Sequence, residues 1–575
     1  MKKSLSLLFT FFYAFAFGQD LITRFERSGG KESPTYFEII EWWKKLDAVS
    51  GKVKMLTMGP TDAGYPLHLV MVANNGDHHF TNIRKSNKRI IFINNGIHPG
   101  EPDGIDASML LARDIVSNKI KLPDNIVLAI IPVYNIGGCL NRSKHYRIDQ
   151  NGPVEKGFRG NSQNLDLNRD FIKCDSKEAR SFTEIFHLLD PDVFIDNHVS
   201  DGADYQHVMT LVSSQHNKLG GAMGTFMHDQ FTPGIFSLMK EKGHHVVPYV
   251  NSFGDNVENG WPAFWDGPRY SSGYATLWHT FAFVPETHML KPYDQRVKAT
   301  YDLMRSFIEF TNRNSEPIRK LRLAAKQATA SAKEFPIDWT LDRSKFDSIL
   351  YLGYASSRRT SEVSGLPVLY YDRSRPFEKK IPYYDRYKIE KTVSIPKAYV
   401  IPQGWWKVIE LLKLNKVKMR PFAKDTLIDV EVYRIEDYKS AARPYEMHHP
   451  NSDVKISSTL AKMRVLKGDY YIPMDQVANR FLVETLEPQA EDSYFNWNFF
   501  DGILGQKEGY SGYAFEPIAA DYLKNNPVLR SKLEERKSAD TAFAKNARAQ
   551  LNFVYQNSPY YEPDHLRYPV YRVKR

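Results

Sequence analysis

Short apolar runs that alternate with helix-length amphipathic segments constrain the fold of this chain more than any other sequence feature. Runs rich in Ile, Val and Phe occupy residues 89–94, 126–133, 192–196 and 280–284, and helical patterns lie between them. Strands that alternate with helices form parallel sheets covered by helices on both faces. We therefore expect a three-layer α/β/α domain with a mixed, largely parallel sheet.

The length of 575 residues predicts more than one domain, because single cores stop growing at about 250–300 residues. The predicted division is a signal peptide at 1–18, the α/β domain at 19–315, a helical linker at 316–340 and a smaller domain at 341–575. Short β-prone runs separated by Pro, Gly and Asp make this last domain β-rich, with a helical tail. The sequence assigns it no role.

The N-terminus has the pattern of an export signal. Lys2 and Lys3 precede an apolar run over residues 5–17, and Ala16 and Gly18 form a small-x-small cleavage site before Gln19. The run is shorter than the about 20 residues that cross a bilayer, and no later stretch is long and apolar enough to cross. We expect an exported protein, periplasmic or extracellular, whose mature chain lacks a transmembrane segment.

Charge and cysteine content argue against a nucleic-acid-binding protein and against a disulfide scaffold. The formal net charge is +10, but Lys and Arg are spread along the chain, so no nucleic-acid groove is predicted. The two cysteines, Cys139 and Cys174, are too few for a disulfide scaffold. They could form one disulfide or remain two buried thiols, and the sequence leaves this open.

An H-x-x-E pattern follows the apolar run at 89–94 and places His98 and Glu101 three residues apart. Ligands of open α/β sheets bind beyond the carboxyl ends of strands, and imidazole and carboxylate are zinc donors. The turn at Pro99 and Gly100 would let both side chains reach one ion. Alone the pattern is weak, because a surface turn with a charged pair would look the same.

A catalytic zinc site needs a third protein ligand. His198 directly follows the run at 192–196, which gives it the same strand-end position as His98. The competing histidines are His207 and the pairs at 78–79, 244–245 and 448–449. Position, rather than residue type, favours His198.

The segment at 158–171 combines two arginines with amides and aspartates. Guanidinium groups bind carboxylates through paired hydrogen bonds, so the segment predicts anion recognition, with an ordinary ion-paired loop as the alternative. Its Asp166 and Asp170 are candidate partners for the histidine ligands. Asp196 is less obvious, because it lies very close to His198 in sequence.

Taken in order, these motifs resemble a known family. H-P-G-E, then R-x-N and D-L-N-R-D-F, then a strand-end His and a Glu ending a late apolar strand are similar to the carboxypeptidase A-like (M14, funnelin) zinc carboxypeptidases. The resemblance covers roughly residues 35–312 and extends to exported bacterial members with an extra C-terminal region. The ordered set is specific, whereas each motif alone is not.

The resemblance implies a role for each matching residue. It implies one zinc ion per chain, bound by His98, Glu101 and His198. It implies Glu286 as the general base and Arg159 as the arginine that polarises the scissile carbonyl. Asn168 and Arg169 are implied to bind the terminal carboxylate of the substrate. The mobile tyrosine of the family is Tyr274 or Tyr270; Tyr274 is favoured, and Tyr270 is assigned to substrate binding. Pro285, Thr287 and His288 depart from the digestive members and leave the specificity pocket open.

The expected function is a zinc metallocarboxypeptidase that hydrolyses the C-terminal peptide bond of peptides with a free terminal carboxylate, through a metal-activated water. A zinc amidase or deacylase, or a carboxypeptidase of peptidoglycan stem peptides, would use the same chemistry. An inactive binding module is the third possibility. Comparing a free acid with its C-terminal amide separates the first two readings, and metal content tests the third.

Overall fold

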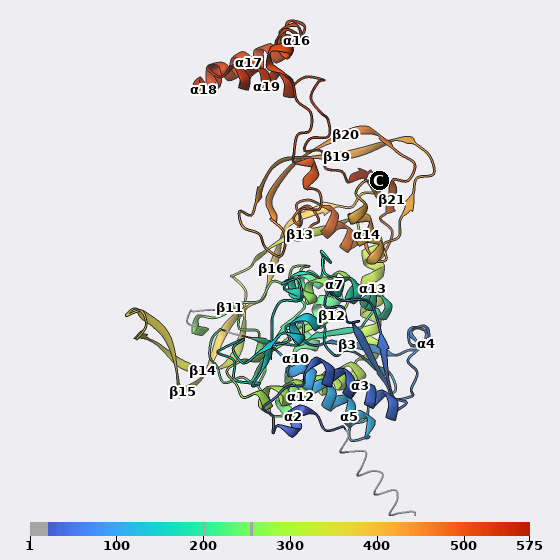
Figure 1. Ribbon diagram of the computed structural model, residues 1–575, viewed down its shortest axis with the longest axis vertical. Helices are drawn as coiled ribbons and strands as arrows, with labels where there is room; N and C mark the ends of the chain where they lie inside the picture. The colour runs from blue at the N-terminus through green and yellow to red at the C-terminus, as the bar shows by residue number, and fades with distance from the viewer. Residues whose placement is uncertain (1–20, 201, 253–256, 575) are drawn as a thin grey trace, which may run out of the picture.

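The computed structural model describes residues 21–574, except 201 and 253–256 (Figure 1). The predicted signal peptide at 1–18 and its cleavage site before Gln19 lie outside the described residues. Among the described helices, none has the length and apolar character needed to cross a membrane.

A mixed sheet forms the centre of the first domain, with nine strands among the described residues. The strands run in the order β1-β2-β4-β3-β7-β12-β9-β10, and β8 also pairs with β12. Their bounds are β1 (Val53–Thr57), β2 (His68–Ala73), β3 (Arg89–Asn94), β4 (Ile126–Ile131), β7 (Val193–Asp196), β8 (His198–Ser200), β9 (Met209–Ser213), β10 (Val247–Pro248) and β12 (Phe281–His288). The central strands β4, β3, β7 and β12 are parallel, whereas β1, β2 and β9 add antiparallel pairs.

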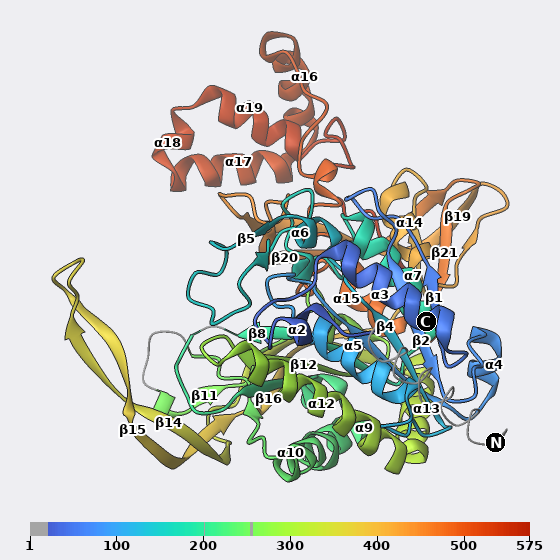
Figure 2. The same cartoon turned by 60° about the horizontal axis from the view of Figure 1, so that its bottom comes forward.

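Helices cover both faces of this sheet. Alternate side chains of a strand point to opposite faces. Ile91 and Ile93 of β3 therefore join the core beneath α3 (Tyr36–Val49), α5 (Asp103–Val116) and α12 (Tyr293–Arg313), which Figure 2 shows on the near side. Ile90 and Phe92 face α7 (Lys177–Leu189) and α11 (Ser271–Leu277) instead. The expected three-layer α/β/α domain is confirmed.

Shorter elements connect these layers. They are α2 (Arg24–Arg27), α4 (Phe80–Lys85), α6 (Ile136–Leu140), β5 (Arg142–Ser143), β6 (Lys156–Gly157), η1 (Leu167–Arg169), α8 (His216–Leu219), α9 (Gly221–Phe226), η2 (Met227–Phe231), α10 (Thr232–Glu241), η3 (Val257–Asn259) and β11 (Trp261–Pro262).

The segment predicted as a helical linker, 316–340, divides between a helix and a strand. Helix α13 (Ser315–Ser331) is followed by β13 (Glu334–Leu341), which pairs with β16 (Tyr387–Ser394). The last part of the linker is therefore strand rather than helix. The aromatic and β-branched side chains Phe335, Ile337 and Trp339 alternate there, a pattern that suits a half-buried strand.

The rest of the chain is β-rich with tail helices, as expected, and a last short strand follows these helices. A long hairpin of β14 (Asp347–Thr360) and β15 (Pro367–Tyr384) extends to one side (Figure 1). A six-stranded sheet among the described residues has the order β18-β21-β17-β22-β19-β20. The remaining elements are β17 (Ala398–Ile401), α14 (Trp406–Leu414), β18 (Arg420–Pro421), β19 (Thr426–Ser440), β20 (Asn451–Val465), β21 (Tyr470–Pro473), α15 (Asn479–Leu486), η4 (Asp501–Ile503), β22 (Tyr571–Val573) and the tail helices α16 (Gly512–Asn525), α17 (Pro527–Ala539), α18 (Thr541–Ala544) and α19 (Ala547–Gln556).

One hydrophobic core joins the β-rich region to the sheet domain. It contains Phe182 of α7 and Trp278 after α11, together with Phe481 and Trp497 from the C-terminal half. The rings of Trp278 and Phe481 lie 5.2 Å apart between centroids. The β-rich region therefore packs on the α7 face of the sheet, whereas the tail helices have a separate small core (Figure 1).

Phe481→Ala should lower the free energy of unfolding by about 3–5 kcal/mol, because it opens a cavity where the two regions share their core. Denaturant unfolding measures the change. Phe346→Ala is the control, since Phe346 is 54% exposed and should lose much less. An equal, small loss in both variants would show that the two regions do not depend on this contact.

Candidate active site

The three residues proposed as metal ligands converge at one edge of the sheet. His98 and Glu101 follow β3, and His198 begins β8. The His98 Nδ1 atom lies 3.1 Å from Glu101 Oε1, and His198 Nδ1 lies 3.2 Å from Glu101 Oε2. One donor atom from each residue lies within 4.8 Å of the other two, and all three side chains are buried.

Backbone pairing explains this convergence. β3 and β7 are parallel with Asn94 opposite Asp196, so the two loops that carry the histidines leave the sheet at the same level. Gly100 permits the close approach of the Gly157 backbone to the loop that carries His98 and Glu101, since a Cβ atom at position 100 would lie 2.7 Å from the Gly157 carbonyl oxygen. Glu286 of β12 lies directly opposite His198 of β8 in a parallel pair.

A carboxylate supports each imidazole through its other nitrogen. Asp166 Oδ1 lies 2.9 Å from His98 Nε2, as the sequence suggested, whereas Asp170 instead accepts hydrogen bonds from Lys173 and Ser176. For His198 the expectation needs correction, because its partner is Asp196, with Oδ2 3.2 Å from Nε2. Residues two apart in an extended chain point to the same side, so closeness in sequence favours this contact.

The carboxylates of this cluster are held ionised. Burial alone would raise the pKa of Glu101, but the charges of His98 and Arg147 outweigh it and place the pKa well below its usual range. Burial likewise opposes ionisation of Asp166, and His98 and Arg159 lower its pKa. Two imidazoles and an ionised carboxylate match the donor set of catalytic zinc sites, which leave one position open. The residues present therefore fit a zinc ion.

A cavity of about 550 Å³ opens over these three residues. Its walls include the other predicted site residues except Tyr274, namely Arg159, Asn168, Arg169, Tyr270 and Glu286. The cavity therefore brings together side chains that lie up to 188 positions apart in sequence, from His98 to Glu286.

The arginines of the cavity are oriented by their neighbours. Arg159 donates from Nε to Asp166 Oδ2 at 3.0 Å, and its Nη1 lies 3.6 Å from Glu101 Oε1. The Arg169 guanidinium lies 4.7 Å from the ring centroid of Tyr270. Beside it, the buried Asn168 Oδ1 has no hydrogen-bond partner among the described residues.

The preference for Tyr274 as the mobile tyrosine is wrong in this structure. Tyr274 is fully buried in the core shared with the C-terminal half, and its hydroxyl donates to Asn415 Oδ1 at 2.7 Å. Tyr270 lines the cavity instead. It precedes α11 with extended backbone angles, so it does not share a helix face with Tyr274 despite the spacing of four residues.

Three residues of the site escaped the sequence analysis. Arg147 donates to Glu101 Oε1 at 2.8 Å and lines the cavity. Tyr445 and Glu446, in the turn between β19 and β20, contact the segment that carries the predicted arginines: the Tyr445 hydroxyl accepts from Arg169 Nε at 2.9 Å, and Glu446 Oε2 accepts from the Asp166 backbone N–H at 2.8 Å. Local sequence offers no signal for contacts across more than 270 positions.

The structure also decides the competing ligand His207 and the state of the two cysteines. His207, the competing ligand, is buried between the His245 carbonyl oxygen and the Leu352 N–H, away from the cluster. Cys139 and Cys174 are free buried thiols, and burial raises the pKa of the Cys139 thiol to about 11. Neither cysteine therefore contributes a disulfide or a reactive thiolate.

Asp196→Asn should weaken zinc binding by about 10- to 100-fold, because a neutral amide orients and polarises the His198 imidazole less than a carboxylate does. Competition with a chromogenic chelator measures the affinity. Asp170→Asn is the matched control: it should change stability but not zinc affinity, since Asp170 contacts Lys173 and Ser176 rather than an imidazole. Equal affinity in the two variants would remove Asp196 from the support of the metal.

Comparison with known proteins finds a family model that matches part of this domain. Residues 39–199, which include His98, Glu101 and His198, match the family model Peptidase_M14, zinc carboxypeptidase. No curated protein sequence gives a significant match.

Among solved structures, the chain is similar to a metallo-carboxypeptidase from Burkholderia cenocepacia, with 14% identity, a TM-score of 0.37 and coverage of 48% of this chain and 69% of that one. A metallo-carboxypeptidase from Pseudomonas aeruginosa, in complex with (2-guanidinoethylmercapto)succinic acid, has 14% identity, a TM-score of 0.36 and coverage of 48% and 68%. Carboxypeptidase A from Helicoverpa armigera has 13% identity, a TM-score of 0.38 and coverage of 50% and 75%.

Proposed function

We propose that this chain, which carries a domain of the M14 zinc carboxypeptidase family, is a zinc-dependent metallocarboxypeptidase that removes the C-terminal residue of peptides. The observation that carries the proposal is the convergence of His98, Glu101 and His198 beneath a cavity that also contains Glu286 and Arg169. His98 and Glu101 come from one loop, whereas His198, Glu286 and Arg169 come from three other segments, and one cavity unites them.

The proposed ligands would hold a single zinc ion through two imidazole nitrogens and the Glu101 carboxylate. When bound, zinc would supply Lewis acidity, which polarises a carbonyl oxygen and acidifies water. Asp166 and Asp196 would keep both imidazoles in the tautomer that presents Nδ1 to the ion.

Glu286 is the proposed proton carrier. Its position opposite His198 places a carboxylate in the cavity beside the ligands, where it could take a proton from water and return it to the leaving amine. The Arg159 guanidinium, held by Asp166, would face the charge that develops on the scissile carbonyl oxygen.

Arg169 and Asn168 are proposed to bind the terminal carboxylate of the substrate. A guanidinium can hold a carboxylate through two parallel hydrogen bonds, which fixes the position of the adjacent peptide bond. Tyr445 and Tyr270 both contact Arg169 and would keep its guanidinium in one orientation. This arrangement favours a substrate with a free C-terminus over an internal peptide bond.

Glu286→Gln should retain zinc but lower kcat by about 10²- to 10⁴-fold, since the amide cannot accept the proton of water. Timed assays of the hydrolysis of a short peptide measure kcat, and metal analysis of the same sample measures the bound zinc. Glu410→Gln, at an exposed position of α14, should leave both unchanged. Normal turnover by the Glu286 variant would exclude this carboxylate as the base.

Arg169→Ala should abolish the preference for a peptide with a free C-terminal acid over its C-terminal amide. The loss for the free acid should be about 2–5 kcal/mol, the range for truncating one partner of a buried charge pair, and the amide should change little. Arg169→Lys keeps the charge without the paired donors and should give an intermediate value. Equal losses for acid and amide would contradict a carboxylate-binding role.

A further inference from the structure

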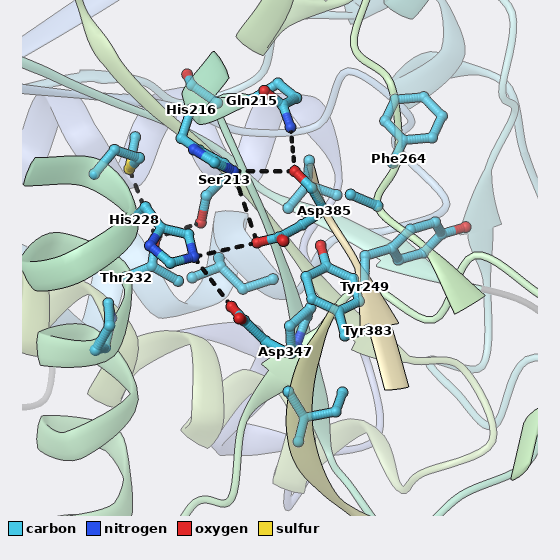
Figure 3. A pocket seen from close by; sticks show the side chains of 18 of the residues that line it. Ser213, Gln215, His216, His228, Thr232, Tyr249, Phe264, Asp347, Tyr383 and Asp385 are labelled. Carbon is cyan, nitrogen blue, oxygen red and sulfur yellow. Dashed lines mark hydrogen bonds and ion pairs between the residues drawn. The ribbon is translucent and has the colours of Figure 1, made fainter. Parts of the chain in front are cut away.

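We propose that the chain has a second divalent-metal site, of the zinc type, formed by His216, His228 and Asp385, with Asp347 beside His228 (Figure 3). These residues share no member with the candidate active site, so the inference does not depend on the proposed function. They line a separate cavity of about 460 Å³.

This second cavity adjoins the first. Val212, Tyr249 and Phe264 line both of them. In Figure 3, the side chains that line this cavity and point toward one another are the imidazoles of His216 and His228 and the carboxylates of Asp347 and Asp385. A metal bound there would lie beside the substrate cavity rather than within it.

One donor atom each of His216, His228 and Asp385 lies within 4.8 Å of the other two. His228 Nε2 lies 3.0 Å from Asp347 Oδ2 and 3.4 Å from Asp385 Oδ2. His216 Nε2 lies 3.8 Å from Asp385 Oδ2. Zinc bonds of about 2.0–2.2 Å separate neighbouring ligand atoms of a tetrahedron by about 3.3–3.5 Å. The distance between His228 and Asp385 therefore already suits zinc, and the His216 imidazole would need to move closer.

Neighbouring groups already orient the donors. Arg386 contacts Asp385 Oδ1 through Nη1 and Asp347 Oδ1 through Nη2, which leaves the Oδ2 atom of each carboxylate facing the imidazoles. Asp229 contacts His228 Nδ1, so His228 Nε2 is the nitrogen directed to the cluster. Hydrogen-bonded carboxylate ligands and a carboxylate behind a histidine are regular features of metal sites.

The backbone supplies a further indication. His228 lies in η2, a π-helical turn of Met227–Phe231, a rare conformation that occurs often at functional sites. His216 begins α8, immediately after β9, whereas Asp347 begins β14 and Asp385 follows β15. A bound ion would therefore fasten the β-rich region to the sheet domain.

The charge of the cluster also favours a cation. Asp229, Asp347 and Asp385 outnumber the single guanidinium of Arg386, which leaves a formal charge of −2 among these groups. A divalent ion would replace the present contact of His216 Nε2 with the Asp385 carbonyl oxygen at 3.0 Å.

The donor set indicates the metal. Calcium and magnesium bind through oxygen atoms, whereas two imidazoles with a carboxylate suit zinc and similar transition metals. The imidazoles come from the sheet domain and Asp385 from the β-rich region, so an ion would join the two. We therefore assign this site a structural role.

Metal content tests the proposal. Full-length protein is loaded with zinc and exchanged into metal-free buffer, and the zinc content per chain is then measured by elemental mass spectrometry. Wild type should hold two equivalents, and both His216→Ala/His228→Ala and His98→Ala/His198→Ala should hold one. A His78→Ala/His79→Ala control should retain two. The second site would be overturned if the wild type held one equivalent of zinc and the His216→Ala/His228→Ala variant held the same amount.

Two further readouts separate this inference from the proposed function and from misfolding. The His98→Ala/His198→Ala variant should still bind one zinc, and added zinc should raise its Tm, because an ion that binds only the folded state stabilises it. If that variant binds no zinc, the second site is wrong while the first remains. Anomalous scattering at the zinc edge from wild-type crystals should show a peak between His216 and His228, and density without a peak there would also refute the site.

Discussion

Parallel pairing of β7 with β3 on one side and β12 on the other is the constraint on which the site depends. Asn94 lies opposite Asp196, and the Glu286 end of β12 lies opposite His198 of β8. A shift of register by two residues would displace a strand end by about 6–7 Å, which is more than a zinc ion can bridge. Placement of the donors is thus a property of the sheet, and the loops need only short turns such as that at Gly100.

Burial of so many charges at this edge requires compensation. A buried carboxylate without partners would take up a proton rather than stay ionised. Glu101 and Asp166 remain ionised because Arg147, Arg159 and the two imidazoles surround them. The same groups that stabilise the carboxylates also orient them, so the electrostatic balance and the geometry of the site have one origin.

The β-rich region is structurally continuous with the sheet domain. It shares a hydrophobic core with α7 and α11, and the turn at Tyr445 and Glu446 contacts the segment that carries Arg169 and Asp166. It also contributes Asp347 and Asp385 to the second cavity. The second cavity is therefore formed by residues from both halves of the chain, whereas the residues that line the candidate active site all come from the sheet domain.

Local sequence determined the strands, the three-layer domain and the strand-end motifs, because alternation, apolar runs and short spacings are properties of neighbouring residues. His98, Glu101 and His198 could be named on that basis, whereas Glu286 could be named only through the family resemblance. Tertiary structure alone decided that Tyr270 rather than Tyr274 faces the cavity, that Asp196 supports His198, and that Arg147 and Tyr445 belong to the site. These outcomes depend on side-chain direction and on packing between distant segments, which no short window of sequence contains.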